Sequence, residues 1–229
     1  MKVFYFTSDK PVNIGDALSP VILEHFTDHK PELASSDESG KLLLVGSLLD
    51  IVMDNDIVCG IGSNKPNFTL EANDTMRFIS VRGPLTRFQI KGADVPKSYG
   101  DPALLLPLIY YPKIEKKKKT GVIPHYIDKK YFPKDQIIDI EQDYTTFIDQ
   151  ILECDEVISS SLHGIIIAEV YGIKTKWVMY GDKIEGGEFK YQDYFLGTGR
   201  KIQKQHRLLD KIPDLKEIQK NIIINLNKL

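Results

Sequence analysis

The sequence is poor in cysteine, has no long apolar run and carries no marked excess of charge. Its two cysteines, Cys59 and Cys154, lie far apart in apolar surroundings. This excludes a disulfide framework and predicts two buried thiols in a reducing compartment. The first apolar run is too short for a signal peptide, and no later stretch approaches membrane-spanning length, so we expect an intracellular protein. A net charge of -2 gives no general attraction for nucleic acid, which is not an expected partner.

Several signatures of nucleotide and metal sites are missing as well. The chain has no GxxxxGKS/T loop, which speaks against a nucleoside-triphosphate hydrolase. It also lacks HExxH, paired CxxC and GxSxG, the motifs of zinc proteases and α/β-hydrolases. Residues 59–66, CGIGSNKP, begin like a nicotinamide fingerprint but have lysine and then proline where the third glycine and a helix are needed. We therefore expect neither a metal nor a bound cofactor.

What is present is an alternation of short apolar runs with helical patterns along almost the whole chain. Such alternation predicts an α/β fold with mainly parallel strands. Strands are expected at 3–6, 42–45, 57–59, 78–81, 121–124, 137–140, 156–159 and 175–179, and helices at 17–26, 84–90, 144–152, 164–171 and 215–229.

A change in composition divides this pattern. Residues 101–120, DPALLLPLIYYPKIEKKKKT, contain three prolines and then four consecutive lysines, which is typical of a linker. We expect an N-terminal α/β lobe over 1–112 and a C-terminal α/β lobe over 113–229 with a closing C-terminal helix. The simplest architecture is two Rossmann-like lobes facing across a cleft, with ligands at the carboxyl ends of the strands. Lys116 to Lys119 are either a solvated connector or a patch that binds the phosphates of a lipid-linked acceptor at a membrane surface.

Two groups of small and polar residues follow predicted strands of the first lobe. In Asn13-Ile14-Gly15-Asp16, Gly15 lets the backbone approach a ligand and Asp16 is placed to cap the next helix, whose free N–H groups attract anions. A cap without a catalytic role is the simpler interpretation of Asp16. In SVRGPLT, Arg82 lies between a strand end and a helix start, where its planar fork can bind phosphate or carboxylate. A surface arginine is the alternative. Asp101 is expected to be structural.

The third group, VISSSLHG at 157–164, runs from a predicted buried strand into a helix. Serine favours the interior of neither element, so its hydroxyls and the helix N–H groups indicate an anion cradle. His163 lies where a proton can be moved near neutral pH. A structural histidine is the alternative, and the surrounding segment favours function. Lys183 follows the last strand, and an exposed lysine is the simpler interpretation of it.

In this order, NIGD, SVRGPLT, YGDPALLL, ISSSLHGIIIAEVYGIK and YGDK resemble the motifs of the polysaccharide pyruvyl transferases, over residues 13 to about 183. The resemblance implies a fold similar to the two-lobed glycosyltransferases of the GT-B type. It also implies that phosphoenolpyruvate places a pyruvate ketal on a sugar. Arg82, His163 and Lys183 match residues that the family uses in donor binding or catalysis. Some members have arginine where this chain has Ser161, so Lys183 and the serines compensate here or the donor is held differently.

From these observations we expect His163 as proton donor or phosphate-orienting residue and Asp16 as acceptor of the sugar hydroxyl proton. The residues expected to bind substrate are Arg82, Lys183, Ser160, Ser161, Leu162, Gly164, Asn13 and Gly15. The expected partners are phosphoenolpyruvate and a sugar or lipid-linked oligosaccharide acceptor. The expected location is the cytoplasm, with peripheral contact at the inner face of the membrane.

Two other functions fit the same fold, because fold does not fix function. One is a nucleotide-sugar glycosyltransferase of GT-B type, in which Glu185 and Lys183 would contact ribose and diphosphate. The other is a glycan- or protein-binding relative without activity, which the short chain and the missing arginine favour. The joint presence of Arg82, His163 and Lys183 speaks against it.

Overall fold

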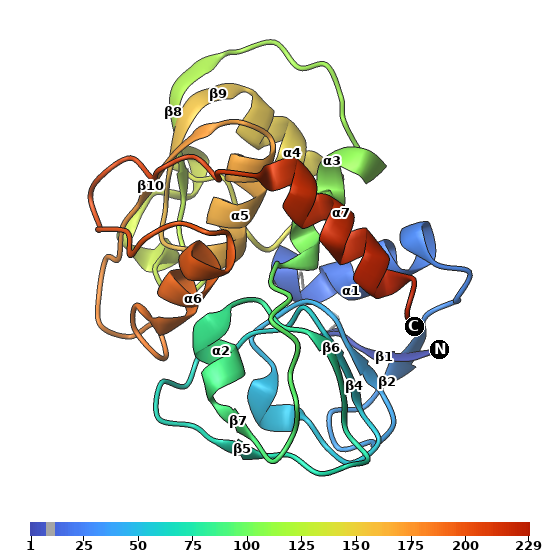
Figure 1. Cartoon of the computed structure of the whole chain (residues 1–229). Coiled ribbons are helices and arrows are strands. Elements are labelled where there is room, and N and C mark those ends of the chain that lie inside the picture. The colour runs from blue at the N-terminus through green and yellow to red at the C-terminus, as the bar shows by residue number, and fades with distance from the viewer. Residues whose placement is uncertain (8–11) are drawn as a thin grey trace.

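The computed structural model describes residues 1–7 and 12–229, and its main strands form two parallel sheets (Figure 1). The larger sheet has the order β2-β1-β3-β4-β6, and the smaller has the order β10-β9-β8. Their strands are β1 (Lys2–Phe4), β2 (Glu32–Ala34), β3 (Leu42–Leu43), β4 (Ile57–Cys59), β6 (Arg77–Ser80), β8 (Lys118–Ile123), β9 (Cys154–Ser159) and β10 (Lys174–Trp177), with β5 (Leu70–Glu71) and β7 (Ile90–Lys91) paired separately. The sheets confirm the predicted parallel α/β architecture and are compatible with a Rossmann-like fold.

Helices connect and cover these sheets. They are α1 (Ile14–Phe26), α2 (Pro84–Phe88), α3 (Leu106–Ile109), α4 (Tyr144–Leu152), α5 (Leu162–Val170), α6 (Phe189–Gly197) and α7 (Leu215–Leu226), with single 3₁₀ turns η1 (Leu49–Ile51), η2 (Pro102–Leu105), η3 (Lys129–Tyr131) and η4 (Lys134–Gln136). Among the described residues, no helix combines the length and apolarity that crossing a bilayer requires. Cys59 and Cys154 are buried free thiols, as predicted. Burial raises the pKa of the Cys59 thiol to about 11.

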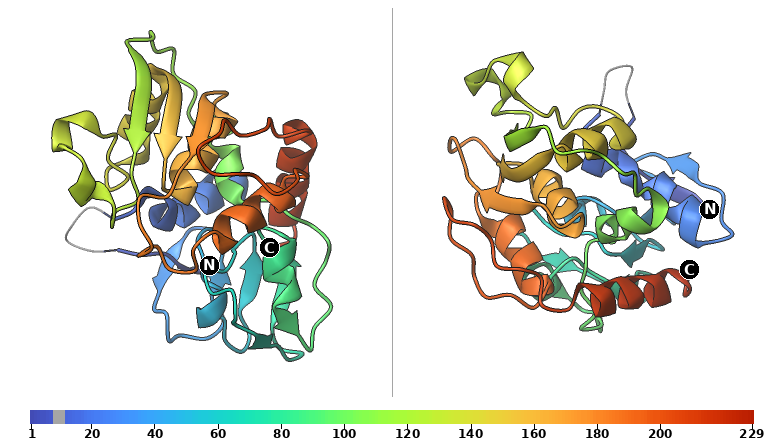
Figure 2. Two further views of the ribbon diagram at one scale, coloured as in Figure 1. Left: turned by 90° about the vertical axis from the view of Figure 1, so that its left-hand side faces the viewer. Right: turned by 90° about the horizontal axis from the view of Figure 1, so that it is seen from above.

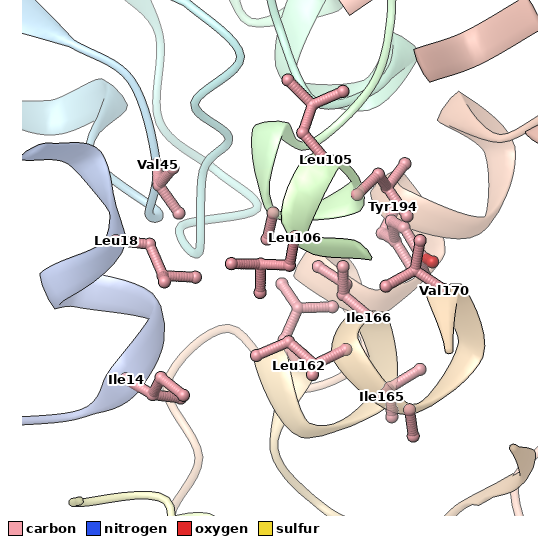
Figure 3. Close-up of a cluster of buried hydrophobic side chains, with 14 of the residues drawn as sticks. Ile14, Leu18, Val45, Leu105, Leu106, Leu162, Ile165, Ile166, Val170 and Tyr194 are labelled. Carbon is pink, nitrogen blue, oxygen red and sulfur yellow. The ribbon is translucent and has the colours of Figure 1, made fainter. Parts of the chain in front are cut away.

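One hydrophobic core joins elements of both sheets. Ile14, Leu18 and Ile22 of α1 recur at the spacing of one helix face and are all buried. Helix α5 is buried on nearly every side, as its continuous apolar sequence predicts. Figure 3 shows Ile14 and Leu18 facing the side chains of Leu106 and of α5. This shared core fixes the amino-terminal ends of α1 and α5 relative to each other.

The carboxyl-terminal part of the chain returns to the first sheet. Helix α7 lies across η2 and approaches α1, in the arrangement that Figures 1 and 2 show. Asn225 Nδ2 donates to Ser98 Oγ at 2.8 Å, and Gln219 Nε2 donates to the Leu104 carbonyl oxygen at 2.7 Å. Helix α6 packs on α2. The boundary between 112 and 113 stays a prediction, and the structure adds that elements beyond it contact the first lobe extensively.

Three local expectations were wrong, and one helix was missed. Residues 137–140 form no strand, although Ile138 and Ile140 are buried, because their hydrogen bonds go singly to Val122 and to the start of α1. The lysine run is exposed but is not wholly a connector, since Lys118 and Lys119 belong to the edge strand β8. Helix α6 was not expected. Helix α1 begins three residues early, at Ile14, with the Asn13 side chain as its cap.

Candidate active site

A cavity of about 200 Å³ lies where strands of both sheets end. Segments that follow β1, β3, β4, β8 and β9 all contribute to it. In the larger sheet, the strand order reverses between β1 and β3, and Asn13 and Ser47 follow these two strands. Ligands of open parallel sheets bind at such a reversal. The lining residues are Phe6, Asn13, Ser47, Leu48, Asn64, His125, Tyr126, Ser161, Leu162, His163 and Lys190.

His163 lies directly against the start of helix α1. A Cβ atom on Gly15 would stand 1.6 Å from His163 Nδ1, so only glycine leaves room for the imidazole. The Asn13 side chain accepts from the Gly15 N–H at 3.1 Å and so fixes this first turn. Gly15 therefore allows the close approach of His163, whereas the expected approach of a ligand to this backbone stays a prediction. The NIGD and SSSLHG segments thus lie side by side and line the same cavity.

Behind His163 lies Asp101, which the sequence indicated only as a structural residue. Asp101 Oδ1 accepts from the Ala103 N–H at 3.0 Å, and Oδ2 lies 3.7 Å from His163 Nε2. Neither Oδ2 nor Nε2 has a hydrogen-bond partner, and both atoms are buried. A shift of less than 1 Å would bring them into hydrogen-bond distance, and such a bond would orient the imidazole. The sequence feature that could have indicated this role is the position of Asp101 directly after the turn residues Tyr99-Gly100.

The serines divide between the cavity and its support. Ser161 caps helix α5, and its Oγ accepts from the Gly164 N–H at 3.4 Å. Ser161 and Leu162 line the cavity, whereas Ser160 lies beneath it. Ser160 Oγ accepts from the His125 N–H at 2.8 Å and donates to Asp128 Oδ2 at 2.7 Å. Gly164 is required by packing, since a Cβ there would lie 2.6 Å from Ser159 Oγ.

Several lining residues escaped sequence analysis, and two of them, His125 and Lys190, are basic. His125 Nε2 and Lys190 Nζ lie 3.5 Å apart. Burial, with the positive charge of Lys190 in addition, lowers the pKa of His125 to about 3. His125 is therefore neutral at pH 7, and Lys190 carries the positive charge of this pair. His125 directly follows the strand predicted at 121–124. It therefore could have been found in the same way as the other motifs, as a polar residue at the end of a predicted strand. Lys190 lies on the unexpected helix α6 and had no local signal.

The neutral state of His125 predicts a pH dependence of stability. The unfolded chain protonates this imidazole near its ordinary pKa of 6.5, whereas the folded protein does so only near 3. Between these values the unfolded state binds the extra proton, so the free energy of unfolding should fall as the pH falls through this window. Urea unfolding at a series of pH values should show a flatter dependence for His125→Gln than for the wild type. An equal pH dependence of the two proteins would show that folding does not lower the pKa of His125.

Arg82 is fully buried, and its guanidinium group lies beneath the cavity instead of among its lining residues. It donates to Ser47 Oγ at 3.0 Å and to the Ser63 carbonyl oxygen at 2.9 Å. Its Nε lies 3.5 Å from Asp193 Oδ2 on helix α6. Burial raises the pKa of Asp193, and the charge of Arg82 opposes this rise. Arg82 thus reaches the cavity through Ser47, and direct donor binding by Arg82 stays a prediction.

Of the other predicted residues, Lys183 is exposed and does not line the cavity. The side chain of Asp16 lies outside the described part of the structure, so its role as a base stays a prediction. The backbone of Asp16 belongs to α1, one residue beyond Gly15, and Asn13 takes the capping position expected for it.

The whole set of motifs also matches a family model, that of polysaccharide pyruvyl transferase, over residues 13–182. The chain belongs to the polysaccharide pyruvyl transferase family. The matched region contains Asn13, Gly15, Asp101 and His163, which the fold brings together at the cavity. This membership places the chain among the transferases, with pyruvyl transfer in polysaccharide synthesis as the activity for which the family is named.

Two individual proteins are similar to this pyruvyl transferase family member. An uncharacterized protein from Acanthamoeba polyphaga mimivirus is 30% identical over 234 residues, which cover 91% of this chain and 79% of the viral protein. A solved structure of a functionally uncharacterized protein from Klebsiella pneumoniae is 14% identical, with a TM-score of 0.47. That match covers 85% of this chain and 86% of the Klebsiella chain.

Proposed function

We propose that the chain transfers a pyruvyl group from phosphoenolpyruvate to a pair of sugar hydroxyls, forming a pyruvate ketal in exopolysaccharide or cell-surface glycan synthesis. The observation that carries the proposal is the pairing of His163 with Asp101 at a small cavity that also receives Lys190. A proton carrier and a cation at the strand ends suit a compact, doubly anionic enol ester. The two sheets act as the lobes of a GT-B-like arrangement, each supplying part of the site.

Donor binding requires several positive or N–H groups within one small volume, because phosphoenolpyruvate has a phosphate and a carboxylate. Lys190 supplies a charge, and the amino-terminal end of α5 supplies N–H groups beside Ser161. Lys190 and Ser161 line the same cavity, so Lys190 is proposed to supply the cation that is missing at Ser161. In this proposal Lys190 takes the donor-binding role that was predicted for Lys183. Arg82 contributes by holding Ser47 at the cavity wall.

The reaction begins when protonated His163 donates a proton to the enol methylene, C3, of the donor. Asp101 orients the imidazole for this transfer, and C2 becomes electrophilic and oxocarbenium-like. One sugar hydroxyl attacks C2, phosphate leaves, and the second hydroxyl closes the ketal. Two C–O bonds form at C2, and one C–H bond forms at C3. The bond between C2 and the phosphate oxygen breaks, and the C2=C3 double bond becomes a single bond. Of the two hydroxyl protons, one in net terms ends on C3 and one on phosphate. Asp16 is proposed to accept the hydroxyl proton.

Calorimetry should distinguish the two lysines. Lys190→Ala is expected to weaken phosphoenolpyruvate binding by about 10- to 100-fold, because a charge-assisted hydrogen bond to the donor is lost. Lys97→Ala, which changes an exposed lysine outside the cavity, is the matched control and should bind like the wild type. Lys183→Ala tests the sequence-based assignment. Weakened binding in Lys183→Ala with none in Lys190→Ala would reverse this part of the proposal.

The activity itself is tested by incubation with phosphoenolpyruvate and candidate lipid-linked or synthetic glycosides. Released phosphate together with the added ketal mass on the glycoside is the expected result. A parallel panel of nucleotide sugars tests the alternative glycosyltransferase. Binding of a nucleotide sugar without binding of phosphoenolpyruvate would replace the proposed function by that alternative.

A further inference from the structure

A second, larger groove adjoins the cavity and has no role in the donor chemistry described above. Its volume is about 880 Å³, against about 200 Å³ for the cavity. Both are lined by Phe6, Ser47, Leu48 and Asn64, so the two spaces share a wall. The groove continues from there along the carboxyl ends of β1 and β2 toward Ser35 and Ser36. A ligand in the groove would thus reach the donor at His163.

The charges of the two spaces have opposite sign. Among the described residues, the groove is lined by the carboxylates of Glu38, Asp50 and Glu185 and by the ammonium group of Lys65. Glu38 is also paired with Lys2 and Asp50 with Lys65, which leaves Glu185 as the carboxylate without a cationic partner among them. Among the side chains that the structure describes, none that lines the cavity is acidic, and Lys190 is one of them. A doubly anionic donor is therefore attracted to the cavity and repelled by the groove. The groove needs a ligand without negative charge.

The side chains of the groove are also suited to hydroxyl groups. Asp50 Oδ2 lies 2.6 Å from Lys65 Nζ, and Glu185 Oε2 accepts from Asn64 Nδ2 at 3.1 Å. Each of these carboxylates keeps a second oxygen that can accept from a sugar hydroxyl. These pairs hold the polar groups in place before a ligand arrives, which lowers the ordering cost of binding.

An aromatic side chain stands at the boundary between the two spaces. Phe6 is 46% exposed, and its ring packs edge-to-face on Phe4, with ring centroids 5.0 Å apart. The contact fixes the orientation of the Phe6 ring. A fixed and exposed aromatic surface is a platform for the apolar C–H face of a sugar ring, whose hydroxyl edge then meets polar groups.

From the shared wall, the charges and this platform, we infer that the groove binds the acceptor as an uncharged sugar, with Phe6 beneath the ring that receives the pyruvyl group. The carboxylates of Asp50 and Glu185 accept hydrogen bonds from its hydroxyl groups, and the Asn64 amide can donate or accept them. The inference depends on the proposed function for the ligand's role as acceptor. It adds that the acceptor sugar is neutral at this position, so that the product gains its negative charge only from the pyruvyl carboxylate.

Saturation-transfer NMR with simple glycosides tests this groove independently of the donor. The probes are the methyl β-glycosides of glucose, galactose and mannose, with the methyl glycoside of glucuronic acid as the anionic match. At least one neutral probe should bind, and the glucuronide should bind about tenfold more weakly. Phe6→Ala should weaken the neutral probe about three- to tenfold, since the stacking surface is lost. Phe88→Ala, which removes a 76% exposed phenylalanine elsewhere, should have no effect.

The donor is measured separately, by calorimetry with phosphoenolpyruvate on the same variants. Asp50→Asn combined with Glu185→Gln should bring glucuronide binding closer to that of the neutral probe, because two repelling charges are removed. Binding of phosphoenolpyruvate without binding of any neutral glycoside, or neutral binding that Phe6→Ala leaves unchanged, would overturn the groove and spare the proposed function. Neutral binding that depends on Phe6, without any binding of phosphoenolpyruvate, would support the groove and overturn the donor assignment.

Discussion

Replacement of His163 by glutamine is expected to lower the rate of phosphate release from phosphoenolpyruvate by about 10²- to 10⁴-fold, the range for loss of a general acid. Glutamine has no group that can donate a proton near neutral pH. It is close to histidine in size, so the contact with Gly15 and the buried position are kept. Formation of the ketal, followed by mass, should fall in parallel with phosphate release.

His25→Gln is the matched control for this experiment. His25 is exposed on helix α1 and lies outside the cavity, so its replacement should leave the rate unchanged. Far-ultraviolet circular dichroism and thermal unfolding of both variants should resemble the wild type. A fully active and folded His163→Gln protein would end the assignment of His163 as the proton donor.

Replacement of Arg82 by methionine is expected to destabilise the protein by about 3–5 kcal/mol, as found when one partner of a buried ion pair is removed. The loss leaves the Asp193 carboxylate fully buried without its cation. It also removes the hydrogen bonds to Ser47 and Ser63. Urea unfolding at pH 7 measures the effect as a lower midpoint with an unchanged slope.

The double variant Arg82→Met with Asp193→Asn separates a stranded charge from lost packing. Asparagine can still accept from the Thr86 N–H, as Asp193 Oδ1 does at 3.0 Å, but carries no charge. The double variant should therefore be more stable than Arg82→Met alone. If Arg82→Met unfolds like the wild type and only phosphoenolpyruvate binding is lost, Arg82 binds the donor directly, as the sequence motif suggested.

Arg82 and Lys190 owe their positions to contacts between segments that are far apart in the chain. Arg82 was singled out because it follows a strand, and the structure does place it at the end of β6. Its side chain is nevertheless turned inward, because Asp193 is brought against it by helix α6, far along the chain. Lys190 has no motif around it. It reaches the cavity only through the packing of α6 on α2.

The alternation of strands and helices, the small and polar residues at strand ends and the family to which the chain belongs followed from the sequence alone. These features depend on backbone preferences and spacing within a few residues, such as Asn13 and Ser161 at helix starts. The tertiary structure alone decided that Asp101 lies behind His163 and that Lys190 places a positive charge at the cavity. It also decided that a separate groove with several carboxylates adjoins the cavity. Distances between side chains from distant segments are set by how the two sheets pack around α1 and α5, and no local pattern encodes them.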